Sequence, residues 1–208
     1  MDELVAIVKT KLQERPDPQD FALWIKPKLN YAIERVETPE EANGLRGIAD
    51  MARVYLRQAL PMVMRDRSEC LKQMYPVEEE YVKVCGKAGL LYKPENSLPG
   101  SNFHNAGFIS SRDATTCIRI GELIEDGELE TYFEHTKENY RHITVGGAES
   151  AWHLLYGKGG KKIPLYKRLN STAEKLYDWM DEVEGDVRDL IVKAWEALND
   201  ASEILKDD

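Results

Sequence analysis

Arginine and hydroxyl side chains recur at helical spacing in the segment that follows Ile109. The entry at Ser110 and Ser111 predicts the start of a helix. One face of this helix would be apolar or small, formed by Ala114, Cys117, Ile118, Gly121 and Ile124. The other face would be polar, formed by Arg112, Thr115, Thr116, Arg119 and Glu122. Guanidinium groups and hydroxyls donate to phosphates and base edges, so the pattern is typical of a DNA recognition helix.

A basic run lies further along the chain. Between positions 157 and 168 the sequence has five basic residues and no acidic one, namely Lys158, Lys161, Lys162, Lys167 and Arg168. We expect these side chains to add contacts to phosphates that do not depend on DNA sequence. The glycines of the run resemble a phosphate-binding loop only in composition. The run follows a predicted helix and lacks the Gly-Lys-Ser/Thr ending, which favours a flexible basic connector.

Other groups capable of catalysis or metal binding lack the spacing that such sites need. The histidines at 104, 135, 142 and 153 show no metal-ligand spacing with one another or with cysteines. Cys70, Cys85 and Cys117 have no paired spacing and are expected to be small core residues in a reducing, cytoplasmic compartment. The abundant carboxylates are expected mainly to solvate an acidic helical surface. We therefore predict no enzymatic activity, no metal and no cofactor.

The elements that would position these residues are all predicted to be helices. In the first half of the chain the expected ranges are 4–12, 20–35, 39–60, 62–75 and 77–91. Asp20 is expected to cap the second helix, and Pro27 to kink or restart it. Thr38 and Glu41 have the spacing of a capping box for the third. Pro76 is expected to separate the last two.

Three regions are expected along the chain. The Pro/Gly/Asn/Ser-rich segment Asn96 to Gly107 marks the end of a helical N-terminal arm, residues 1–95. Residues 96–168 would form a core in which Asp126-Gly127 opens a second helix and the Ile143 to Gly146 turn opens a third. Residues 169–208 would form an acidic C-terminal helix.

This C-terminal region has a regular apolar pattern. From Ala173 to Ile204, apolar residues recur in steps of three and four without a break, which predicts one long helix with a heptad seam. The seam could pair with a second copy as a coiled coil. Trp179 and Trp195 widen the apolar stripe, which favours packing of the helix on the rest of the protein.

The charge of the chain is unevenly distributed. The net charge is -9, but residues 169–208 hold twelve acidic and four basic residues, a local charge of -8 that leaves -1 for residues 1–168. An acidic protein attracts DNA weakly, and such binding depends strongly on salt. No apolar run is long enough to span a membrane.

The order of the motifs resembles a known family. The Ser110-Ser111 entry and Thr115-Thr116 are followed by Arg119-Ile120, a Gly-Glu-Leu helix end, an acidic helix and the Ile143 to Ala148 turn. This order is similar to the helix-turn-helix core of ParB and KorB type partition proteins. It is closer to small phage and prophage proteins that carry the core behind a helical arm. The segment 40–60 resembles the arm of those proteins. The similarity covers about residues 38 to 156. The ParB nucleotide-binding box, with its Gly-Glu-Arg-Arg run, is not found.

The resemblance implies an all-α protein with a helix-turn-helix core, a helical arm and a long C-terminal helix. It implies binding of double-stranded DNA, as a phage or plasmid regulator or a partition-type factor. Because a symmetric DNA site requires two recognition helices, a homodimer is expected. The alternative is a helical protein-protein interaction module, a phage-encoded inhibitor or adaptor that reuses the core. The acidity and the long helices favour this alternative, and the charge separation favours DNA.

Overall fold

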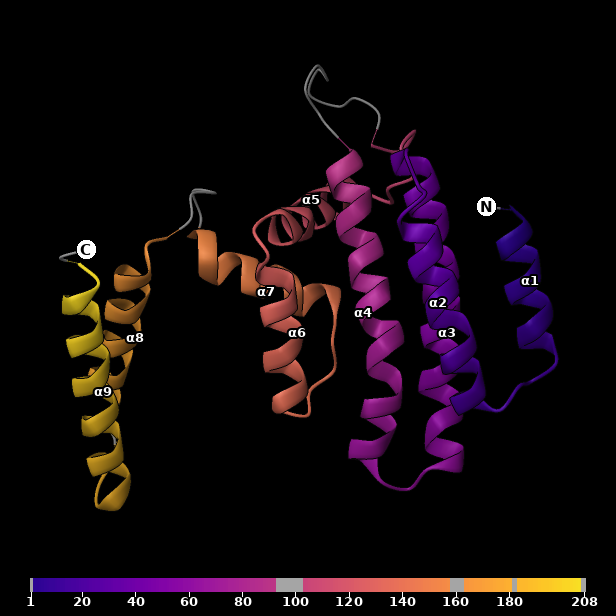
Figure 1. Cartoon of the computed structure of the whole chain (residues 1–208). Coiled ribbons are helices and arrows are strands. Elements are labelled where there is room, and N and C mark those ends of the chain that lie inside the picture. The colour runs from indigo at the N-terminus through magenta and orange to yellow at the C-terminus, as the bar shows by residue number, and fades with distance from the viewer. Residues whose placement is uncertain (1, 93–102, 158–162, 181–182, 207–208) are drawn as a thin grey trace. The chain divides into compact units, whose positions relative to one another are not determined.

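The structure, a computed structural model, describes residues 2–92, 103–157, 163–180 and 183–206. Within these ranges every regular element is an α-helix, as predicted (Figure 1). The chain divides into two compact units, Met1–Ser150 and Ala151–Asp208. The first unit therefore contains the predicted arm and most of the predicted core.

The first unit begins with α1 (Asp2–Gln13) and α2 (Pro18–Ile33). The Asp17 side chain caps α2, accepting hydrogen bonds from the backbone N–H groups of Gln19 at 2.9 Å and Asp20 at 3.1 Å. The predicted cap, Asp20, is therefore wrong by one helical turn, because Pro18 can occupy the first helical position without losing a backbone bond. Pro27 lies inside α2, which continues through it.

The next helices are α3 (Pro39–Val63) and α4 (Arg67–Leu91). The predicted capping box of α3 is present, formed by Thr38 and Glu41. α3 runs three residues beyond its predicted end at Leu60, through Pro61. The helices predicted at 62–75 and 77–91 are one helix, α4, which begins at Arg67, whereas residues 62 and 63 belong to α3. Packing of α4 against its neighbours outweighs the backbone bond that a proline removes.

Helix α4 is the centre of the first unit, because α2, α3, α5 and α6 all pack against it (Figure 1). Neighbouring turns of these helices supply fully buried apolar side chains. These include Phe21, Ile25, Leu29, Leu45, Ile48, Leu56, Val82, Cys85 and Phe133. Burial of this surface is the main favourable contribution to folding.

Three shorter helices follow: α5 (Ser111–Glu125), α6 (Glu128–Glu138) and α7 (Val145–Tyr156). Gly127 has a positive φ of 71° and permits the tight turn from α5 to α6. The predicted openings of α6 at Asp126-Gly127 and of α7 after Thr144 are confirmed.

The second unit contains the pair α8 (Leu165–Met180) and α9 (Asp186–Ile204), which pack against each other. The predicted long C-terminal helix is present as α9, but the predicted continuous seam from Ala173 is divided between two helices. Gly185, with a φ of 66°, precedes α9. The rings of Tyr177 and Trp195 lie 6.0 Å apart between the helices. None of the described helices combines the length and the apolar character that crossing a membrane requires.

Candidate nucleic-acid interface

A salt bridge fixes the first turn of α5. Arg46 on α3 donates from Nη2 to Asp113 Oδ1 at 2.8 Å and from Nη1 to Asp113 Oδ2 at 3.1 Å. The Ile109 N–H also donates to Asp113 Oδ2, at 3.1 Å. Burial acts to raise the pKa of Asp113, but the Arg46 and Ile109 hydrogen bonds outweigh it and hold the pKa below its usual value. The carboxylate is therefore a charged anchor between α3 and α5.

The segment before α5 is tied to the same part of α3. The Asn43 side chain donates to the Ala106 carbonyl at 2.7 Å. Phe108 is buried, its ring 5.0 Å from the ring of Tyr92 at the end of α4. These contacts hold the chain that enters α5.

Close approach of α4 and α5 holds the rest of the helix. A Cβ added to Gly89 would lie 2.1 Å from the Cys117 carbonyl oxygen, and one added to Gly121 would lie 3.0 Å from the Gly86 carbonyl oxygen. The two backbones therefore touch, which only glycine permits at these positions. Such contact leaves α5 little freedom to slide on α4.

Four of the predicted DNA contacts face solvent at the beginning of α5: Ser110, Ser111, Arg112 and Thr115. Ser110 caps the helix, its Oγ accepting from the Asp113 N–H at 3.1 Å. Thr115 Oγ1 donates to the Ser111 carbonyl at 2.8 Å. The Ser110 hydroxyl proton and the Thr115 oxygen lone pairs remain available to a ligand.

Two residues predicted to contact DNA, Thr116 and Arg119, are covered by other parts of the protein rather than exposed. Thr116, expected on the solvent face, is buried with 8% exposure. Arg119 is partly buried and pairs with Glu149 of α7, with 2.5 Å between Nη1 and Oε1. The partner of Arg119 comes from α7, and α5 packs against α6 as well as α4, so the buried arc of α5 is broader than one stripe. Within this arc Ile120 and Leu123 are fully buried, whereas Ile118, predicted as inward, is only partly covered.

The predicted basic run is only partly described. Lys158, Lys161 and Lys162 lie outside the described residues. Lys167 and Arg168 belong to the first turn of α8 in the second unit, where Lys167 is exposed and Arg168 is partly buried.

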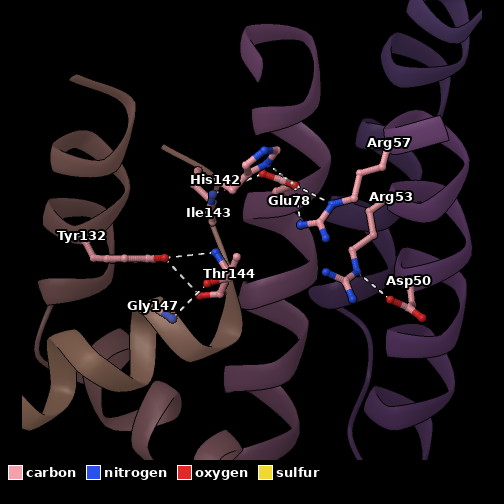
Figure 2. Close-up of polar contacts among 9 residues, drawn as sticks. All are labelled: Asp50, Arg53, Arg57, Glu78, Tyr132, His142, Ile143, Thr144 and Gly147. Carbon is pink, nitrogen blue, oxygen red and sulfur yellow. Dashed lines mark hydrogen bonds and ion pairs between the residues drawn. The ribbon is translucent and has the colours of Figure 1, made fainter. Parts of the chain in front are cut away.

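A hydrogen-bonded turn ties the start of α7 to α6. The Tyr132 hydroxyl accepts from the Thr144 N–H and donates to the Thr144 carbonyl, both at 3.0 Å (Figure 2). Thr144 Oγ1 in turn accepts from the Gly147 N–H at 3.0 Å and so caps α7. A Cβ at Gly147 would meet the Tyr132 hydroxyl oxygen at 2.4 Å. Glycine at this position therefore makes room for the tyrosine.

A buried carboxylate joins this turn to α3 and α4. Glu78 on α4 is 1% exposed, and its Oε1 accepts from Arg57 Nε at 3.0 Å and Nη2 at 2.7 Å. Its Oε2 accepts from the Ile143 N–H at 3.2 Å, and His142 Nδ1 lies 3.6 Å from Oε1 (Figure 2). Glu78 of α4 thus binds two segments that are distant from it in sequence, α3 and the segment before α7.

The next two residues are also buried glutamates. Consecutive helical residues point about 100° apart, so Glu79 and Glu80 face other neighbours than Glu78 does. Glu79 pairs with Lys137 of α6. Burial raises the pKa of Glu80 to about 7. The carboxylates were expected mainly to solvate an acidic helical surface, and these three are buried instead. The apolar residues near this triplet in sequence, Val77 and Val82, are both buried and are the signal that could have revealed it.

No protein-family model, curated protein or solved structure matches the chain. Within the described ranges, no three or more histidine, cysteine or carboxylate side chains cluster in a way that could hold a metal ion.

Proposed function

We propose that the protein binds double-stranded DNA through the first turn of α5, as the recognition helix of a ParB-like helix-turn-helix core. One observation carries the proposal: Ser111, Arg112 and Thr115 are exposed on a turn that the Arg46–Asp113 salt bridge fixes from behind. Recognition helices contact base edges with their N-terminal residues. The free N–H groups of a helix N-terminus also favour a phosphate.

Binding should be weak and sensitive to salt. The acidic charge of residues 169–208 opposes association with DNA, whereas residues 1–168 carry a charge of only -1. Ile109, which is 82% exposed beside the turn, supplies an apolar contact for a thymine methyl group. A second copy of the chain would place a second α5 on a symmetric site.

Fluorescence anisotropy with a labelled duplex of random sequence, over a salt series, tests the proposal. Arg112→Gln should weaken binding about fivefold or more and reduce the salt slope by about one, because one phosphate or base contact is lost. Arg188→Gln removes an exposed arginine from α9 and should leave affinity unchanged. Wild-type protein that shows no salt-dependent binding, or an Arg112→Gln variant that binds normally, would refute the proposal.

The second candidate is a helical protein-protein interaction module. It is favoured by large apolar side chains that the first unit exposes, among them Leu23 at 74%, Tyr31 at 60% and Met62 at 86%. Isolated exposed apolar residues are common. This observation is therefore weaker support than the exposed polar side chains in the first turn of α5. A protein partner bound equally well by the wild type and Arg112→Gln, together with absent DNA binding, would favour this candidate.

A further inference from the structure

A groove of about 700 Å³ lies where α3 ends and α4 begins. Buried Leu71 and Met74 form part of an apolar floor. Arg57, Arg65 and Arg67 also line the groove. The segment before α7 contributes the remaining wall, with His142 and Thr144. The groove therefore combines an apolar interior with a basic edge.

The positive charge of the edge comes from two arginines. Arg65 and Arg67 are exposed, and no carboxylate among the described residues pairs with either of them. Asp66, which lies between them, caps α4 by accepting from the backbone N–H groups of Ser68 at 2.7 Å and Glu69 at 3.4 Å. The charge of Arg57 is balanced by buried Glu78. Two guanidinium groups thus remain available to an anion.

Hydrogen bonds within the protein hold the lining of the groove in place. Met64 lies in its lining, and its sulfur accepts from Gln19 Nε2 of α2 at 3.5 Å. The Met64 N–H donates to the Leu60 carbonyl at 2.8 Å, which holds the backbone after α3. Glu78 fixes Arg57 and the Ile143 backbone on the other side (Figure 2). A preformed site lowers the entropic cost of binding.

We propose that this groove binds a small amphipathic organic anion, an apolar body of one or two rings that carries a phosphate or carboxylate. The volume lies within the range of small-molecule pockets. The apolar floor would cover the body, and the planar guanidinium groups of Arg65 and Arg67 would each bind two oxygens of the anion. This site is separate from the α5 turn, and the proposal does not depend on DNA binding.

Isothermal titration of the full chain with four matched compounds tests the chemistry. 1-Naphthyl phosphate has both the body and the charge, 1-naphthol has only the body, and inorganic phosphate has only the charge. We expect saturable binding of 1-naphthyl phosphate with a Kd roughly tenfold or more below those of the other two, because only it uses both halves of the groove. 1-Naphthoate distinguishes a carboxylate ligand from a phosphate ligand. Equal binding of 1-naphthol, or no saturable binding of either anion with a naphthyl body, overturns the proposal.

Paired variants locate the site. Arg65→Gln with Arg67→Gln should weaken the binding of the preferred anion about tenfold or more, because both guanidinium contacts are lost. Arg15→Gln with Arg188→Gln removes the same charge from exposed positions elsewhere and should leave the Kd unchanged. Circular dichroism and melting should match the wild type in both cases, since all four side chains are exposed. Equal loss of affinity in the two double variants would show attraction by net charge alone and overturn the assignment.

Discussion

Arg46 and Asp113 form two parallel hydrogen bonds, of 2.8 and 3.1 Å, although 67 positions separate them in the sequence. Arg46 lies in the second turn of α3, and Asp113 is the third residue of α5. The pair therefore anchors the turn that exposes Arg112 to α3.

Removing the Asp113 charge should destabilise the protein. We expect Asp113→Asn to lower the free energy of unfolding at neutral pH by about 1–3 kcal/mol, because Arg46 would keep a largely buried charge without its counter-ion. The pKa of Asp113 is lowered in the folded state, so its contribution is present above the ordinary value of 3.8 and is lost as pH falls through the folded value. Urea unfolding at neutral and acidic pH measures both effects.

The control is Asp50→Asn, which breaks the more exposed pair with Arg53 on a single helix. It should cost well under about 1 kcal/mol. Equal losses for Asp113→Asn and Asp50→Asn would contradict an anchoring role for Asp113.

A methyl group at the α4–α5 contact should be poorly tolerated. Gly89→Ala would place a Cβ 2.1 Å from the Cys117 carbonyl oxygen and force the helices apart, at a cost of about 1–3 kcal/mol. Gly47→Ala is the matched control, since no atom lies within 4 Å of its added Cβ. Alanine favours a helix interior, so Gly47→Ala should stabilise by roughly 0.5–1 kcal/mol. Thermal melts that rank the two variants in the opposite order would contradict backbone contact at Gly89.

Glu80 should make stability depend on pH near neutrality. Burial raises its pKa from 4.5 to about 7, so the contribution of the neutral acid is present below 4.5 and lost as pH rises through 7. Glu80→Gln, which stays neutral, should therefore stabilise at about pH 8 by roughly 1–3 kcal/mol, and the gain should vanish near pH 5. Denaturant unfolding across this range measures the difference.

Glu134→Gln, at an exposed position of α6, should show no such trend. A gain for Glu80→Gln that is the same at both pH values would argue against titration of a buried carboxylate.

Glu78 should be the most sensitive acid of the triplet. Glu78→Gln keeps the shape but leaves Arg57 without its buried counter-ion, so we expect a loss of about 2–4 kcal/mol. Hydrogen exchange should also show faster exchange of the Ile143 amide, which donates to Glu78 Oε2 at 3.2 Å. Glu69→Gln, which breaks an exposed pair with Lys72, should cost less than about 1 kcal/mol and leave the Ile143 amide protected. Unchanged Ile143 exchange in Glu78→Gln would contradict the proposed link between α4 and the start of α7.

Local signals in the sequence were sufficient for several elements. Thr38 with Glu41, the Ser110 cap and the Asp126-Gly127 turn all marked helix starts that the structure contains. Their hydrogen bonds close within a few residues, so the neighbouring sequence alone determines them. The all-helical class followed from the same patterns.

Tertiary packing decided the features that depend on distant partners. Pro76 ended a helix in the prediction, yet α4 continues through it because four other helices surround α4. Thr116 and Arg119 had the spacing of an exposed face, and contacts with other helices placed one in the core and the other against Glu149. The C-terminal apolar pattern continues unbroken across the turn before α9, so its periodicity could not reveal where α8 ends. Periodicity reports which side chains are apolar, whereas the partner of each face is set only when helices distant in sequence meet.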